Sequence, residues 1–175
     1  MCSSDLLGDP GLLARLLLSG GPPRPRYRLG LVAHYVDERD PVFAHVRARI
    51  PATRLVRVST PPARFLAELR ECEVVLSSAM HGLIAADALG IPNARIRVAD
   101  RITGGDYKFR DYYSVFGVDP PTLSRDELWH LTAADLDRIE ATYAIAPADV
   151  TRVIDGLLAT CPFTFRADAT ATRAA

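Results

Sequence analysis

The stretch Val74–Pro92, VVLSSAMHGLIAADALGIP, decides the fold that we expect for this chain. Its first three residues form a short apolar run, typical of a parallel strand buried on both faces. From Met80 onward, apolar residues recur at roughly helical spacing. Gly90 suits a helix C-cap and Pro92 blocks continuation. The pattern predicts a buried strand that passes directly into a helix over residues 80–89.

The turn between this strand and this helix has the chemistry of an anion site. Ser77 and Ser78 are favoured N-cap residues, and a helix start presents unpaired N–H groups and partial positive charge to phosphates and carboxylates. Gly82 lacks a Cβ, so a ligand could approach the backbone closely. His81 could donate to an anion or transfer a proton near neutral pH. The alternative is an ordinary strand-to-helix connection with a surface or capping histidine.

The same alternation of strand and helix continues along the chain. We expect further strands at 28–35, 53–58 and 94–98, and helices at 42–49 and 61–70. This order predicts an α/β domain, a Rossmann-like parallel sheet of at least four strands with helices on both faces.

The remaining segments complete the predicted organisation. Residues 1–23 are interpreted as an N-terminal segment and linker, 24–166 as the α/β domain, and 167–175 as a disordered tail. Residues 102–117 are rich in glycine, charge and aromatic side chains, which favours an irregular functional loop. Residues 123–158 have a polar helical pattern that is split near a proline.

The composition narrows the class of protein. A length of 175 residues fits one domain, and a formal net charge of zero gives no reason to expect a nucleic-acid partner. The longest apolar run is too short to span a membrane, and no signal-peptide pattern is found. Three scattered cysteines without metal-binding spacing indicate reduced thiols, and we expect a cytoplasmic protein with no metal site.

Four segments carry a family resemblance. They read SSAMHGLIAADALGIP at 77–92, GGDYKFRDYYSVFG at 104–117, LGDPGLL at 7–13 and RLGLVAHYVDERD at 28–40. Together they resemble the polysaccharide pyruvyl transferase family, over roughly residues 7–117. Many members have arginine two residues before the motif histidine. This chain has Ala79 there, which indicates a subgroup or a weaker anion site.

The resemblance implies a fold and a reaction. The family is similar to two-domain transferases of the GT-B type, and this chain resembles the second half. The implied reaction moves a pyruvyl group from phosphoenolpyruvate to a sugar of an exopolysaccharide or other cell-surface repeat unit, and forms a cyclic ketal. Phosphoenolpyruvate is the donor substrate, and we expect no cofactor. A lipid-linked acceptor would bring the enzyme to the inner face of the membrane as a peripheral protein.

The reaction needs an anion cradle, a proton donor and a proton acceptor. His81 would act as general acid or hold the phosphate, while Ser77, Ser78 and Gly82 would form the cradle. Lys108, the only lysine of the chain, would neutralise phosphate or carboxylate as a compact point charge. Asp111 would orient it or accept a hydroxyl proton. The alternative for this pair is a surface salt bridge.

Three further residues each have a functional and a structural interpretation. His34 follows an apolar strand, so it would face the same cleft, or else serve as a capping or core histidine. Tyr112 would stack on a sugar ring, or else pack in the core. Asp9 would contact substrate, or else form a turn.

Two other functions remain open at this point. One is half of a nucleotide-sugar glycosyltransferase, although the acidic nucleotide-binding residue expected of such a domain is not identified. The other is a truncated chain that folds and binds anions without turnover, because a cleft enzyme cannot close with one wall.

Overall fold

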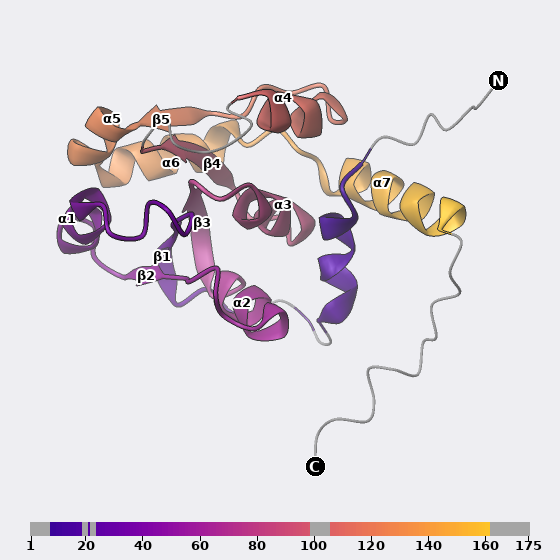
Figure 1. Ribbon diagram of the computed structural model, residues 1–175, viewed down its shortest axis with the longest axis horizontal. Helices are drawn as coiled ribbons and strands as arrows, with labels where there is room; N and C mark the ends of the chain where they lie inside the picture. Colours follow the sequence, from indigo (N-terminus) through magenta and orange to yellow (C-terminus); the bar gives the residue numbers. More distant parts are fainter. Residues whose placement is uncertain (1–7, 19–20, 22–23, 99–105, 162–175) are drawn as a thin grey trace, which may run out of the picture.

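The computed structural model describes residues 8–18, 21, 24–98 and 106–161. Within them, a five-stranded, all-parallel sheet has the strand order β2-β1-β3-β4-β5, with helices on both faces (Figure 1). This arrangement confirms the Rossmann-like α/β class. The elements in chain order are η1 (Pro10–Leu17), β1 (Tyr27–Val32), α1 (Pro41–Arg49), β2 (Thr53–Leu55), α2 (Pro62–Leu69), β3 (Cys72–Ser77), α3 (Met80–Ala88), β4 (Asn93–Arg97), α4 (Tyr107–Ser114), β5 (Thr122–Ser124), α5 (Arg125–Trp129), α6 (Ala133–Thr142) and α7 (Pro147–Thr160).

The side chains of the central strands alternate between the two faces of the sheet, as the period of a strand requires. Leu29 and Leu31 of β1 belong to the hydrophobic cluster that includes α1, α5 and α6. Val32 of β1 and Val75 of β3 belong to the cluster that includes α2 and α3. Both faces of β1 and β3 are therefore covered, which explains the continuous apolar run at the start of the deciding stretch.

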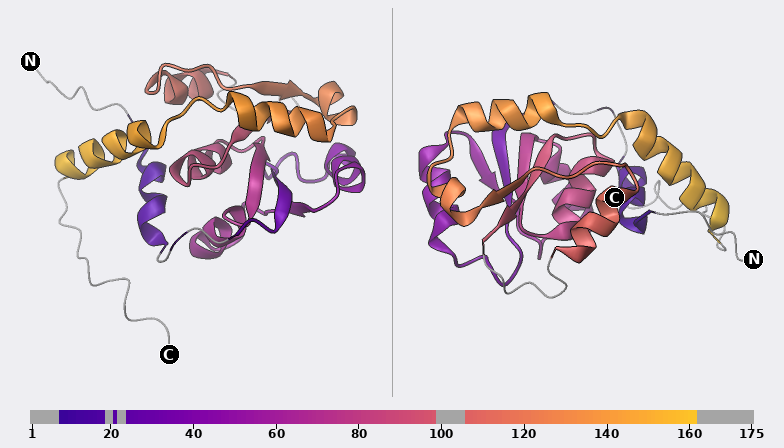
Figure 2. Two further views of the ribbon diagram at one scale, coloured as in Figure 1. Left: turned by 180° about the vertical axis from the view of Figure 1, so that it is seen from behind. Right: turned by 90° about the horizontal axis from the view of Figure 1, so that it is seen from above.

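A third hydrophobic cluster lies beyond the sheet, around α3. Leu12 of η1 is fully buried there with Leu83 and Ile84 of α3, and side chains of α4 and α7 join them. Helix α7 lies beside η1, at the end of the molecule away from the strands (Figures 1 and 2). Helix α3 is thus enclosed on several sides, and seven of its nine residues are buried.

Part of the segment predicted as an irregular loop is a helix instead. Residues 102–105 lie outside the described residues, but Tyr107–Ser114 forms α4. Its buried residues Phe109, Tyr112 and Tyr113 have the i, i+3, i+4 spacing of one helix face. The aromatic content that suggested a loop is the apolar stripe of a packed helix.

The predicted helical segment at 123–158 begins with a short edge strand. Ser124 ends β5, where it pairs in register with Arg97 of β4. The same serine then caps α5 through a capping box with Glu127, and Thr132 caps α6 in the same way with Asp135. These caps divide the segment before α7, which begins at the proline near which the pattern predicted a split.

Two further predictions bear on chemistry and location. Cys72 and Cys161 are free thiols, and burial raises the pKa of Cys72 to about 12, so this thiol is unreactive. No helix among the described ranges has the length and apolar character needed to cross a membrane. The predicted tail at 167–175 lies outside the described residues.

Candidate functional site

The strand order creates a switch point between β1 and β3. The chain leaves β1 toward β2 on one side and leaves β3 toward β4 on the other. In open α/β sheets, the crevice outside the carboxyl ends of such strands is the usual place for a ligand. His34 follows β1, Ser77 ends β3 and Ser78 follows it, so these sequence-predicted residues gather around this crevice.

A pocket of about 590 Å³ opens at this switch point. The volume lies within the range of about 300–1,000 Å³ that is common for small-molecule sites. Four predicted site residues line this switch-point pocket, namely His34, His81, Gly82 and Lys108. The rest of its lining is Tyr35, Val58, Thr60, Pro62, Phe65, Ala79 and Met80.

The first turn of α3 supplies backbone donors to this pocket. Its N-cap is Ala79, which has no side-chain oxygen to occupy the first N–H groups. Among the hydrogen bonds of the described residues, none is donated by the backbone of Met80 or His81. Both residues line the pocket. The helix start can therefore bind an anion through its N–H groups and partial positive charge.

The two serines, Ser77 and Ser78, have a different role from the one predicted. The Ser77 hydroxyl accepts a hydrogen bond from the Ala79 N–H at 3.0 Å and donates one to the Ala79 carbonyl at 2.7 Å. The Ser78 hydroxyl accepts from the backbone N–H of His34 at 2.8 Å. Both side chains are buried, at 0% and 1% exposure. The structure places the serines in the scaffold that shapes the anion site, instead of in the cradle itself.

Gly82 is explained by packing between helix and strand. A Cβ at this position would lie 2.4 Å from Ser77 Oγ and 2.9 Å from Val32 Cγ1. These distances are too short for any side chain, so only glycine lets α3 approach β1 and β3 this closely. Gly82 also lines the pocket, so its predicted role of letting a ligand approach the backbone stays a prediction beside this packing constraint.

Helix α4 brings Lys108 to the pocket, and the start of this helix is held by an arginine that sequence reasoning missed. Arg95 of β4 pairs with Asp106 at 2.6 Å, and its guanidinium lies 3.8 Å from the centroid of the Phe109 ring. Arg95 also lowers the pKa of Asp106, which keeps this carboxylate ionised. The available signal was an arginine inside an apolar strand, because four of the five β4 residues are buried and a buried charge needs a partner.

A second missed residue, Asp87, joins α3 to α4. The carboxylate is fully buried and accepts hydrogen bonds from Asn93 Nδ2 at 2.6 Å, Tyr143 Oη at 2.9 Å and Tyr112 Oη at 3.0 Å. Burial raises its pKa to about 6, although these three donors oppose the shift. Nothing in the helical pattern distinguished Asp87 from an exposed acid.

Tyr112 therefore does not have the sugar-stacking position that was predicted. Its side chain is 4% exposed, and its ring packs edge-on against Tyr113 at a centroid distance of 4.9 Å. Lys108 and Tyr112 are one turn apart on α4. The bond from Tyr112 to Asp87 consequently fixes the face of the helix that also carries Lys108.

Asp111 lies apart from the switch-point pocket. It lines a neighbouring pocket of about 170 Å³ together with Asp9, and Met80 lines both pockets. Asp9 caps η1, where its carboxylate accepts from the Gly11 N–H at 2.7 Å. The turn reading of Asp9 is thus observed, while the catalytic role of Asp111 stays a prediction.

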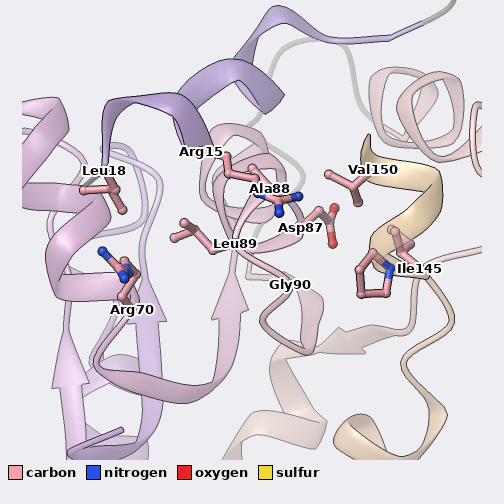
Figure 3. Close-up of a pocket in the computed structure, with 10 residues that line it drawn as sticks. Arg15, Leu18, Arg70, Asp87, Ala88, Leu89, Gly90, Ile145 and Val150 are labelled. Atoms are coloured by element: carbon pink, nitrogen blue, oxygen red, sulfur yellow. The ribbon is translucent and has the colours of Figure 1, made fainter. Parts of the chain in front are cut away.

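A third pocket, of about 420 Å³, lies at the opposite end of α3 from His81. Asp87 forms part of its wall, together with Arg15, Arg70 and apolar residues of α3 and α7 (Figure 3). None of the predicted site residues lines it. In the described parts of the chain, no three His, Cys, Asp or Glu side chains gather as a metal site would require.

Comparison with known sequences identifies the family. The sequence model described as polysaccharide pyruvyl transferase matches residues 8–100, just over half of the chain. The chain belongs to the polysaccharide pyruvyl transferase family. The matched part of this chain includes β1, β3 and α3, together with His34, which follows β1, and His81 on α3. It ends before α4, so Lys108, Asp111 and Tyr112 lie beyond the matched segment.

One relative shows how much of a longer protein this transferase-family chain covers. A protein of Acanthamoeba polyphaga mimivirus, described as uncharacterized, is 34% identical over 120 residues. The alignment spans 67% of this chain and 42% of the viral protein. The chain therefore spans less than half the length of this relative.

Proposed function

We propose that this domain holds phosphoenolpyruvate for transfer of its pyruvyl group to a sugar of a polysaccharide repeat unit. The observation that carries the proposal is the convergence of His34, His81 and Lys108 on one pocket at the start of α3. Family membership supports a pyruvyl transferase. A donor with one phosphate and one carboxylate matches a pocket with backbone N–H groups, two histidines and a lysine.

The proposed reaction is balanced in protons and bonds. A proton adds to the methylene carbon of phosphoenolpyruvate, and the adjacent carbon becomes electron-poor. One sugar hydroxyl attacks this carbon and loses its proton to a base, which replaces the proton delivered by the acid. The C–O bond to phosphate then breaks, a second hydroxyl attacks, and its proton goes to the departing phosphate. The products are the pyruvate ketal and inorganic phosphate. Acid–base groups and an anion site are what this sequence needs.

Three pocket residues have a role in this scheme. His81 is exposed on the first turn of α3, so it can deliver the proton to the methylene carbon. Lys108 neutralises the phosphate or the carboxylate in both the ground state and the transition state. His34 supports the donor from the opposite side of the switch point.

Binding of the donor can be tested on the chain as it stands. Chemical-shift titration of the ¹⁵N-labelled protein with phosphoenolpyruvate is expected to perturb the amides of Met80 and His81 first. Lys108→Met should weaken this binding about tenfold, because a point charge on an anion is lost. Arg110→Met is the matched control: Arg110 is an exposed cation on the same helix and does not line the pocket.

Two outcomes would contradict the proposal. One is perturbation at another surface with no change at the start of α3. The other is equal loss of binding in the Lys108 and Arg110 variants, which would indicate a diffuse charge effect. Binding of a nucleoside diphosphate in preference to phosphoenolpyruvate would support the glycosyltransferase alternative.

A further inference from the structure

The switch-point pocket has two chemically different walls. His81 on α3 and Lys108 on α4 form a polar wall. The other side comes from the segments that follow β1 and β2 and from α2. Besides His34 and Thr60, it carries the apolar surface of Tyr35, Val58 and Phe65. A pocket built in this way fits a ligand, or a pair of ligands, with an anionic part and an apolar face.

Tyr35 dominates the apolar wall. Its side chain is 73% exposed although it lines the pocket, so much of the ring is available to a ligand. The ring packs against the His34 imidazole with the centroids 4.4 Å apart and the planes tilted by 37°. His34 is in turn fixed to β3 by the bond from its N–H to Ser78. The tyrosine is therefore an exposed aromatic on a supported backbone.

We propose that Tyr35 is the platform for the acceptor sugar, and that a pyranose ring stacks on it opposite the polar wall. This inference rests on the proposed function and assigns the second substrate a place within the same pocket. A pyranose has a face of C–H bonds and an edge of hydroxyls. Its C–H face suits the negative face of an aromatic ring, and its hydroxyls remain free to point toward the reacting carbon.

Size and chemistry both favour a sugar in this place. A volume of about 590 Å³ exceeds what a three-carbon phosphate needs, so space remains beside the donor. Val58 and Phe65 extend the apolar surface next to Tyr35. Tyr107 is equally exposed, at 73%, but does not line the pocket, so exposure alone does not distinguish Tyr35.

The test measures sugar binding and donor binding separately on the intact chain. Methyl glycosides of glucose, galactose and mannose serve as probes in saturation-transfer and chemical-shift NMR, with and without phosphoenolpyruvate. Tyr35→Ala should weaken binding of the preferred glycoside about tenfold, while Tyr35→Phe should retain it. Tyr107→Ala should leave it unchanged. Tyr35→Phe, which keeps the ring beside His34, and Tyr107→Ala should not alter phosphoenolpyruvate binding by more than about twofold.

The outcomes separate this proposal from the function on which it rests. Failure of every glycoside to bind the parent protein, or equal loss in the Tyr35 and Tyr107 variants, would overturn the acceptor platform and leave the donor site intact. Glycoside binding that depends on Tyr35 without any phosphoenolpyruvate binding would keep the platform and refute the donor proposal. Uridine competing for Tyr35 more strongly than the glycosides would overturn the platform as a sugar site.

Discussion

The backbone N–H of His34 donates a 2.8 Å hydrogen bond to the hydroxyl of Ser78. This bond joins the segment after β1 to the end of β3 across the switch point of the sheet. The Ser78 N–H donates back to the Val32 carbonyl at 3.0 Å. The two strand ends that border the pocket are consequently held as one unit.

Ser78→Ala should therefore loosen both the fold and the pocket. It leaves the half-buried N–H of His34 without its acceptor, which costs at most about 1–3 kcal/mol of unfolding free energy. Urea unfolding measures this loss. Ser114→Ala is the control, because the Ser114 hydroxyl is exposed and bonds within its own helix. Equal stability of the two variants would show that the hydrogen bond between Ser78 and His34 does not contribute to the unfolding free energy.

Gly82→Ala should destabilise the protein through a steric clash. The added Cβ would meet Ser77 Oγ at 2.4 Å and Val32 Cγ1 at 2.9 Å, so α3 must move away from the sheet. Overpacking of this kind costs about 1–3 kcal/mol. Gly21→Ala, where a Cβ meets no atom within 4 Å, should unfold like the parent protein. Thermal and urea unfolding of both variants checks the contrast.

Asp87 should make stability fall as pH rises through the weakly acidic range. Its folded pKa of about 6 lies above the ordinary value of 3.8, so between these values the folded state binds a proton that the unfolded state has released. The stabilising effect of low pH amounts to at most roughly 3 kcal/mol. It is complete below the unfolded pKa and is lost as pH rises through the folded pKa.

The comparison variant for this effect is Asp87→Asn, which removes the titration. The unfolding free energy of the parent minus that of this variant should fall from about pH 4 to about pH 7, because only the parent loses stability as Asp87 ionises. Urea unfolding at each pH measures this difference. Acids with lowered pKa values, such as Asp40 and Asp135, are present in both proteins and cancel. A difference independent of pH would mean that Asp87 titrates normally.

His81→Gln should separate catalysis from binding. The amide keeps a hydrogen-bond donor near the anion but cannot transfer a proton, so turnover should fall about 10²-fold or more while phosphoenolpyruvate still binds. Turnover is followed as phosphate release that requires a sugar acceptor. His130→Gln, an exposed histidine on α5's C-cap, is the control. Unchanged turnover in the His81 variant would refute the proton-transfer role.

Sequence patterns predicted the central part of the fold well. The apolar runs of β1 and β3 and the helical spacing of α3 report burial on two faces, and this burial is what the structure shows. The short strand β5 was missed, because three residues at a sheet edge are too few to display alternation. The stripe of Phe109, Tyr112 and Tyr113 had helical spacing, but the charged residues between them favoured a loop.

The site was predicted in outline and differs in detail for physical reasons. His34, His81 and Lys108 reach one pocket because parallel strands end at a common edge. The serine hydroxyls were expected to face a ligand, but their nearest partners are backbone groups within two residues or across a strand. Asp87 could not be predicted, because its partners come from segments far apart in the sequence.

The segment after β2 is exposed, and this affects which parts of the pocket can change in sequence. From residue 57 to 64 no side chain is buried, so this segment contributes nothing to the three hydrophobic clusters. Val58 and Thr60 nevertheless face the pocket. Substitutions here alter the surface offered to a ligand at little cost in folding free energy. Under the proposed function, the segment after β2 is where the pocket can change to suit a new acceptor without disturbing the buried helix α3.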